Sequence, residues 1–190
     1  MDRPVPRENF SKAVTFSQAR ASGKRQDHTK GGTDVEKQQL GEQLWQLRVS
    51  LLRLAVSIVG NGHDAEDAVS SAIMKAMSHA DNLRSPDSLK PWVMRITARC
   101  CYDLLRRRKR ETPVCLLPET PVLQAADSLM DDIRALDPKY ARPLILYYYE
   151  GMSAPEIASV LHLPRTAVSM RLSRGRKMLK ERLKEASRDD

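Results

Sequence analysis

The sequence predicts an all-α protein made of two small helical domains that an extended linker joins. Apolar residues recur at spacings of three and four in several segments, as the buried face of a helix requires. No segment shows the alternation of apolar and polar residues that is typical of a half-buried strand. The middle of the chain, residues 111–127, contains Pro113, Pro118 and Pro121, which favour an extended linker. We therefore expect a first domain over residues 37–110, a linker over 111–121 and a second domain over 122–187.

The chain begins with a polar segment, residues 1–36, that contains Gly23, Gly31 and Gly32 and has no apolar period. Such a composition predicts a flexible N-terminal extension. The segment lacks the apolar core of a secretory signal, and no apolar run in the chain approaches the ~18 residues that span a membrane. These features predict a cytoplasmic protein that does not insert directly into a membrane.

Two helices are predicted at the start of the first domain. The first covers residues 40–58 and ends at the turn formed by Gly60, Asn61 and Gly62. Its apolar face consists of Leu40, Leu44, Leu47, Leu51, Leu54 and Ile58. The second begins near Asp64, and Asp64, Glu66 and Asp67 lie in its first turn, where the helix dipole favours negative charge.

A polar loop over residues 81–88 leads to a third predicted helix, which reaches about residue 110. Ser88 is a suitable N-cap, and Pro91 falls in the first turn, where proline is tolerated. Trp92 and Ile96 are expected to pack in the core of a three-helix bundle. The remaining face is strongly basic, with Arg95, Arg99, Arg106, Arg107, Arg108, Lys109 and Arg110.

In the second domain, one helix is predicted to end before Asp137 and Pro138, and the next to end at Gly151. The core of the latter helix is expected to include Leu144, Ile145, Tyr147 and Tyr148.

Residues 153–184 have the layout of a helix-turn-helix, whose second helix enters the DNA major groove. Ser153 and Glu156 form a capping box, and Pro155 lies in the first turn. Pro164 ends the first helix, because the residue before a proline is pushed out of the α region. The second helix is rich in arginine and lysine, and a solvated charged helix is the plainer alternative.

The net charge of +8 and the pI of about 9.6 favour nucleic acid or another anionic surface as partner. The linker itself is acidic, which suggests that two basic domains bind one polyanion; a simple solvated tether explains it equally well.

The three cysteines, Cys100, Cys101 and Cys115, have no zinc-ligand spacing and are expected to be small buried hydrophobes, with redox sensing as the alternative. His63 and His79 are expected on the surface. We predict no metal, no cofactor and no catalytic residue.

Four segments in order resemble one known family: DAEDAV at 64–69, KPWVMRI at 90–96 followed by LLRRR at 104–108, YYYEGMS at 147–153, and the helix-turn-helix. Together they resemble the extracytoplasmic-function (ECF) sigma factors of the sigma-70 family, over about residues 40–110 and 122–185. The resemblance implies a sigma region 2 domain and a sigma region 4 domain. It also implies core RNA polymerase, promoter DNA and an anti-sigma protein as partners.

The resemblance assigns roles to particular positions. The second helix would bind the clamp helices of the polymerase β′ subunit, the second domain would contact the β flap, and the linker would run through the active-centre cleft. The residues expected to bind the clamp are Asp64, Glu66, Asp67 and Ser70. The family commonly has glutamine, an acid and an aromatic residue after this motif, where this chain has Ser70, Ser71 and Ile73, so the contact is expected to differ in detail. In the helix-turn-helix, His162 stands at a turn position that is usually glycine-like.

The third helix and its preceding loop would bind the promoter −10 element as a single strand, which requires cations along a groove and a pocket for an unstacked base. Trp92 would either stack on a base or pack in the core. The candidate residues are Asn82, Arg84, Ser85, Asp87, Ser88, Lys90, Trp92, Arg95, Arg99, Arg106 and Arg107.

The helix-turn-helix would read the −35 element. The start of its second helix is expected to face base edges, with Arg165, Thr166, Ser169 and Met170 as candidates. Later cations are better placed for phosphates, namely Arg171, Arg174, Arg176 and Lys177, although Arg171 or Arg174 is also a candidate for a guanine contact. Val168 and Leu172, four residues apart, are expected to face the core.

Two other functions compete with that of a sigma factor. A stand-alone helix-turn-helix regulator would bind a palindrome as a dimer. A nucleic-acid-processing enzyme would need a metal or nucleophile constellation, and the sequence offers none.

Overall fold

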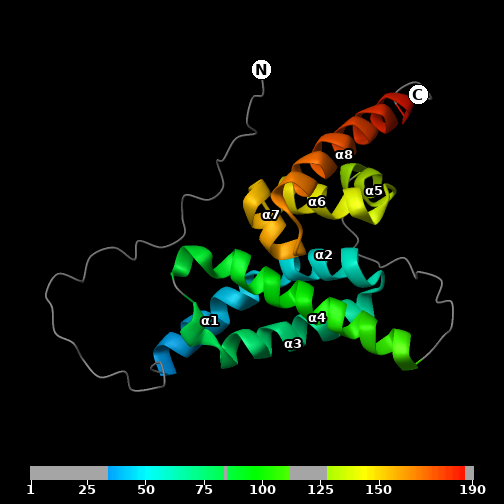
Figure 1. Cartoon of the computed structure of the whole chain (residues 1–190). Helices are drawn as coiled ribbons and strands as arrows, with labels where there is room; N and C mark the ends of the chain where they lie inside the picture. The colour runs from blue at the N-terminus through cyan, green and yellow to red at the C-terminus, as the bar shows by residue number, and fades with distance from the viewer. Residues whose placement is uncertain (1–33, 84, 112–127, 187–190) are drawn as a thin grey trace, which may run out of the picture. The chain divides into compact units, whose positions relative to one another are not determined.

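The computed structural model describes residues 34–83, 85–111 and 128–186. Residues 1–33 of the extension expected over residues 1–36, Arg84, and residues 112–127 of the linker region lie outside this part, whereas residues 34–36 are helical. Within it every regular element is helical, in agreement with the predicted fold class (Figure 1). Helices α1 to α4 form an N-terminal bundle and α5 to α8 a C-terminal bundle.

The first predicted helix is in fact two helices, α1 (Asp34–Gln46) and α2 (Arg48–Val59). The prediction of one continuous helix is therefore wrong. Leu47 nevertheless keeps helical hydrogen bonds on both sides: its N–H donates to the Gln43 carbonyl at 3.2 Å, and its carbonyl accepts from the Leu51 N–H at 2.9 Å. Leu44 on α1 and Leu51 on α2 are both fully buried. Helix α2 ends as predicted at Gly60, whose positive φ of 85° suits glycine.

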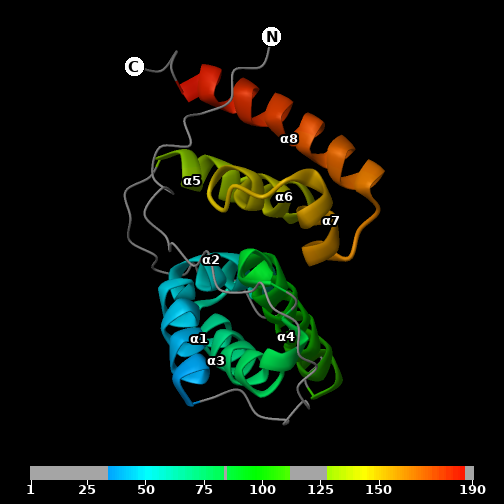
Figure 2. The same ribbon diagram turned by 90° about the vertical axis from the view of Figure 1, so that its left-hand side faces the viewer.

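Helix α3 spans Gly62–Ser78 and begins two residues earlier than predicted. Asn61 caps it, because its side-chain oxygen accepts a hydrogen bond from the Asp64 N–H at 2.8 Å. Small side chains make up most of its buried face, namely Ala65, Ala68, Ala72 and Ala76 beside Val69. These alanines allow α3 to pack closely on its neighbours, and Figure 2 shows α3 beside α4.

Two short 3₁₀ turns, η1 (Ala80–Asn82) and η2 (Pro86–Ser88), lead into α4 (Leu89–Glu111). Val93, Met94, Ala98 and Cys101 are buried on one face of α4, together with Thr97, whose hydroxyl donates to the Val93 carbonyl at 3.0 Å. Because this face is buried, Arg95 and Arg99, which lie between these residues in the sequence, point toward solvent.

The buried carboxylate of Asp64 connects the start of α3 to the end of α4. It accepts hydrogen bonds from Arg108 at 2.5 Å and from the Asn61 side-chain amide at 2.7 Å, and Asp64 is only 3% exposed. Burial of a carboxylate is tolerated when hydrogen bonds and an opposite charge compensate it. Asp64 is therefore a structural residue of the bundle.

The C-terminal bundle contains α5 (Ser128–Arg134), α6 (Pro138–Tyr148), α7 (Ala154–Leu161) and α8 (Arg165–Ala186). Asp137 caps α6, and the hydrogen bonds from the backbone N–H and the side chain of Lys139 hold the pKa of Asp137 below its ordinary value. Leu144 and Ile145 are buried as predicted. Tyr147 and Tyr148 are exposed, so their placement in the core was wrong; α6 buries Leu146 instead.

Helix α8 crosses α6 at a close approach that depends on Gly175. A β-carbon at Gly175 would lie 3.0 Å from Leu144 Cδ1 and 3.4 Å from Tyr140 Cβ, and Leu144 is itself fully buried. The two helices can approach this closely only because the position carries no side chain.

The first prediction concerns the two carboxylates at the start of α3. We expect Asp64→Ala to lower the free energy of unfolding by about 1–2 kcal/mol, because it removes the buried acceptor of Arg108 and Asn61. Glu66→Ala removes a carboxylate whose side chain is 60% exposed and should change stability by less than about 0.5 kcal/mol. Urea unfolding followed by circular dichroism measures both, and equal losses would contradict the structural role of Asp64.

The second prediction concerns the helix crossing. Gly175→Leu should destabilise the protein by about 1–3 kcal/mol through overpacking against Leu144. Ser173→Leu introduces the same side chain at an exposed position of α8 and is the matched control. A thermal unfolding midpoint that is the same in both variants would show that α6 and α8 do not depend on the glycine.

Candidate nucleic-acid interface

The geometry of a helix-turn-helix is present in α7 and α8. The predicted capping box is confirmed: the Ser153 N–H donates to Glu156 Oε2 at 2.8 Å. His162 takes the left-handed conformation at φ 52° and ψ 47°, so this histidine does occupy the position usual for glycine. The Leu163 N–H then donates to the Ala158 carbonyl at 2.9 Å, and α8 begins two residues later at Arg165.

The buried face of α8 fixes which of its residues are available to a partner. Val168 and Leu172 are buried as predicted, and Gly175 and Leu179 continue the same stripe. The candidates for base contact lie outside the stripe and are all exposed: Arg165, Thr166, Ser169 and Met170.

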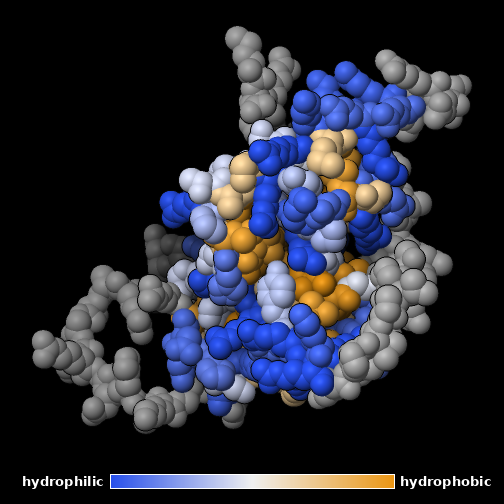
Figure 3. Space-filling view, turned by 45° about the vertical axis from the view of Figure 1, so that its right-hand side comes forward, coloured by the Kyte–Doolittle hydropathy of each residue, from blue (hydrophilic) through white to orange (hydrophobic). Residues whose placement is uncertain are grey.

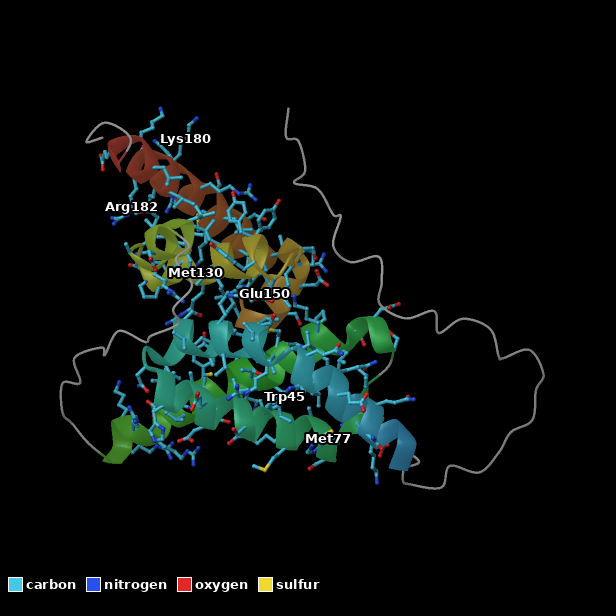
Figure 4. All side chains as sticks on the ribbon, turned by 180° about the vertical axis from the view of Figure 1, so that it is seen from behind. Trp45, Met77, Met130, Glu150, Lys180 and Arg182 are labelled. Atoms are coloured by element: carbon cyan, nitrogen blue, oxygen red, sulfur yellow. The ribbon has the colours of Figure 1, made fainter. Side chains whose placement is uncertain are left out.

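Among the candidate phosphate-binding residues, Arg174 and Lys177 are exposed and Arg171 is half-buried. Arg176 differs, because its guanidinium lies 4.5 Å from the centre of the Tyr147 ring and its Nε is buried. Arg176 thus packs α8 against α6. Farther along α8, Arg182 pairs with Asp132 of α5 at 2.8 Å; Figure 4 labels Arg182 there. Exposed cations therefore lie along the whole length of α8, from Arg165 to Lys184.

A second basic surface follows α4. Arg95, Arg99, Arg106 and Arg107 are exposed. Arg106 pairs with Asp103, and these two residues line a shallow hollow with Arg107 and Arg110. In the space-filling view of Figure 3, hydrophilic residues occupy the upper and lower parts of the visible face, and larger hydrophobic areas lie between them.

The residues expected to form a base pocket before α4 are only partly brought together. Asn82 and Asp87 are exposed on the two 3₁₀ turns, and Ser85 is exposed just before the second turn. Ser88 is half-buried, and Arg84 lies outside the described residues. Trp92 is half-buried and packs against the core, which is the plainer of the two roles considered for it. Lys90 is half-buried because it contacts Glu150.

A third surface lies on α3 and the junction of α1 with α2. Glu66, Asp67 and Ser70 are exposed, whereas Asp64 is buried beneath them. Three apolar residues of these helices are exposed and were not predicted as site residues: Trp45, Val49 and Met74, which are 69%, 57% and 65% exposed. The guanidinium of Arg48 lies 5.4 Å from the Trp45 ring centre and 3.9 Å from Glu66, which links the two elements. Trp45 lies outside the leucine stripe of residues 40–58, and this was the signal that could have revealed it.

Cys100, Cys101, His63 and His79 lie where the sequence predicts them. Burial and the neighbouring Cys100 raise the pKa of Cys101 to about 12, so the Cys101 thiol stays protonated at neutral pH. Cys100 is also buried, Cys115 lies outside the described residues, and His63 and His79 are exposed. In the part of the chain that the structure describes, no three His, Cys, Asp or Glu side chains are grouped as metal ligands. No described helix is both long and apolar enough to cross a membrane.

Both bundles are similar to known protein families. Residues 46–111 match the family model of sigma-70 region 2, and residues 127–179 match that of sigma-70 region 4. The chain is 31% identical over 137 residues to the RNA polymerase sigma factor SigV of Bacillus subtilis, across 69% of this chain and 82% of SigV. It is 25% identical over 156 residues to the ECF sigma factor SigW of the same organism, across 71% and 83% of the two chains.

Solved structures show the same fold. The sigma factor RpoE in its complex with the anti-sigma factor NepR from Bartonella quintana superposes with a TM-score of 0.63 at 23% identity, over 77% of this chain and 98% of RpoE. CnrH, in complex with the cytosolic domain of CnrY, superposes with a TM-score of 0.55 at 25% identity, over 78% and 90% of the two chains. The chain belongs to the extracytoplasmic-function subfamily of the sigma-70 family, whose members direct core RNA polymerase to specific promoters.

Proposed function

We propose that this sigma factor reads the −35 element with the first turns of α8, holds the −10 strand along α4, and docks on core polymerase through α3. The observation that carries the proposal is the orientation of α8. Its buried stripe runs through Val168 and Leu172, so Arg165, Thr166 and Ser169 stand on faces that the bundle leaves open. This is the arrangement in which the start of a recognition helix meets base edges.

For the −35 element, base readout falls to Arg165, Thr166, Ser169 and Met170, and to Arg171 or Arg174 where a guanine is within reach. Arginine can form two parallel hydrogen bonds to guanine O6 and N7, which makes it the commonest specific reader. Lys177 is suited to a phosphate, because its ammonium group supplies a positive charge but lacks the planar guanidinium geometry with which arginine forms two parallel hydrogen bonds to a base. Arg176 supports α8 through the Tyr147 ring and contributes to the positive field rather than to base readout.

For the −10 element, Arg95, Arg99, Arg106 and Arg107 supply cations along one side of α4, which suits the backbone of a separated strand. Asn82, Ser85 and Asp87 offer polar groups at the end of this surface. Because Trp92 packs against the core, we assign it to the support of the surface and the base contacts to the loop.

For core polymerase, Glu66, Asp67 and Ser70 form the exposed face of α3, and Trp45, Val49 and Met74 add apolar area on this side of the bundle. An exposed apolar group with a charged rim is typical of a protein interface. The clamp helices of β′ are the proposed partner here, and the β flap that of the C-terminal bundle. Asp64 is omitted from the contact because Arg108 and Asn61 use its carboxylate.

An anti-sigma protein is the proposed regulator, by analogy with RpoE bound to NepR and CnrH bound to the cytosolic domain of CnrY. We further propose a cytoplasmic location and no catalytic activity of its own, as promoter selection requires only binding surfaces. The polymerase supplies the chemistry.

The deciding experiment is co-purification of the chain with bacterial core RNA polymerase over a salt series, followed by transcription from genomic fragments. Stoichiometric binding with new start sites would support the proposal. A dimer that binds palindromic DNA and ignores core polymerase would overturn it.

The third prediction tests base readout. Arg171→Ala or Arg174→Ala should weaken binding to the −35 element by about 1–3 kcal/mol if that residue contacts a base, and should relax specificity at one position. Lys184→Ala removes an exposed cation near the end of α8 and should leave base preference unchanged. Transcription from the cognate promoter and binding to duplexes with single base changes measure both effects. Unaltered transcription in both arginine variants would refute the assignment.

The fourth prediction tests the polymerase surface. Asp67→Lys reverses an exposed charge on α3 and should reduce co-purification with core polymerase at least about tenfold, since like charges opposed in an interface cost several kcal/mol. The fold should be intact by circular dichroism. Glu185→Lys makes the same charge change at the far end of α8 and serves as control. Normal recovery of polymerase with Asp67→Lys would remove α3 from the docking surface.

A further inference from the structure

A buried carboxylate joins the two bundles. Glu150 follows α6, its side chain is fully buried, and it pairs with Arg53 of α2 and with Lys90 of α4, whose Nζ lies 2.8 Å from Glu150 Oε2. Figure 4 shows Glu150 where the C-terminal bundle faces the N-terminal one. Neither the capping of α7 nor the base-reading face of α8 uses this residue.

Other polar contacts surround this pair. Lys90 also donates to the Glu150 carbonyl at 3.0 Å, Arg95 donates to the Ser159 hydroxyl at 3.2 Å, and Arg142 donates to the Ser57 carbonyl at 2.9 Å. The Arg53 guanidinium lies 5.3 Å from the Tyr149 ring centre. These hydrogen bonds and ion pairs can separate in water, because each polar group is rehydrated when its contact opens.

The cations in this contact overlap with the proposed DNA surface. Lys90 and Arg95 are both candidates for binding the −10 strand in the sequence, and here both bind groups of the C-terminal bundle. Helix α7 packs on α4, the helix that carries them. A strand that ran along this part of α4 would have to displace α7.

We propose that Arg53 and Lys90 form an anion site that takes a backbone phosphate of the separated promoter strand, and that Glu150 fills this site when the two bundles are closed. The inference rests on the proposed function of α4. It adds Arg53, a residue of α2, to the DNA-binding surface, and it makes closure of the bundles and capture of the strand mutually exclusive.

The chemistry of the site suits either anion. A guanidinium fork and an ammonium group together bind carboxylates and phosphate oxygens alike. Burial alone would raise the pKa of Glu150, but the hydrogen bond and charge of Lys90, with Ser50 and Arg53, outweigh it and hold this pKa below its ordinary value. Glu150 is therefore ionised at neutral pH and can compete with a phosphate for Arg53 and Lys90.

Closure lowers the apparent affinity of the free chain for single strands, since that affinity scales with the fraction of open molecules. Glu150→Gln keeps the shape of the side chain and removes its charge. We expect this variant to bind a fluorescein-labelled oligothymidine at least about fivefold more tightly than the wild type in fluorescence anisotropy. Glu42→Gln makes the same charge change at an exposed position of α1 and should bind like the wild type.

The contribution of Arg53 is separated by adding a second substitution. In the Glu150→Gln background, Arg53→Gln should remove most of the gain, whereas Arg48→Gln, which removes a cation on the same helix, should not. Equal losses from the two substitutions would overturn the assignment of Arg53 to a phosphate site.

Opening is measured independently by small-angle X-ray scattering. Glu150→Gln should increase the radius of gyration of the full chain relative to the wild type and Glu42→Gln.

If Glu150→Gln does not fold, Ser159→Arg replaces it as the opening variant, because a cation opposite Arg95 repels α4 without altering Glu150. A folded opening variant with unchanged radius and unchanged oligothymidine binding overturns the inference. Promoter-directed transcription with core polymerase, measured in parallel, shows whether the proposed function stands when the inference fails.

Discussion

The packing of one apolar stripe of α8 against α6 and α7 is the constraint on which the DNA-binding surface depends. Val168, Leu172 and Leu179 are buried, and Gly175 brings α8 close to Leu144. A helix has only one such face, so burial of these residues decides where each cation points. The same reasoning applies to α4, where burial of Val93 and Ala98 turns its arginines toward solvent. The chemistry of both surfaces is thus a consequence of core packing.

Features that depend on neighbours in sequence were predictable. The capping box of Ser153 and Glu156 and the buried positions of α8 follow from spacings of three or four residues. The end of α2 at Gly60 follows from the glycine itself. The helical fold class followed from the same periodicity. The acidic start of α3 was also visible, but which of its carboxylates would be buried was not.

The features that the sequence did not reveal depend on residues distant in the chain. Asp64 is buried because Arg108, 44 positions away, pairs with it. Glu150 meets Arg53 across 97 positions. Tyr147 is exposed, and its ring lies against the guanidinium of Arg176 on α8. No local pattern encodes such pairings.

The distribution of ion pairs explains how a chain of net charge +8 can remain selective for its polyanion. Among the described residues, Arg53, Lys90, Arg108 and Arg182 all pair with carboxylates of the chain itself. Each such pair reduces the non-specific attraction to phosphates, which depends on the number of cations available to release counterions. Exposed cations at the start of α8 have no carboxylate partner within that part of the chain, so duplex contact can begin there. Capture of a separated strand on α4 then requires the exchange of internal carboxylates for phosphates, which places strand binding after domain separation rather than before it.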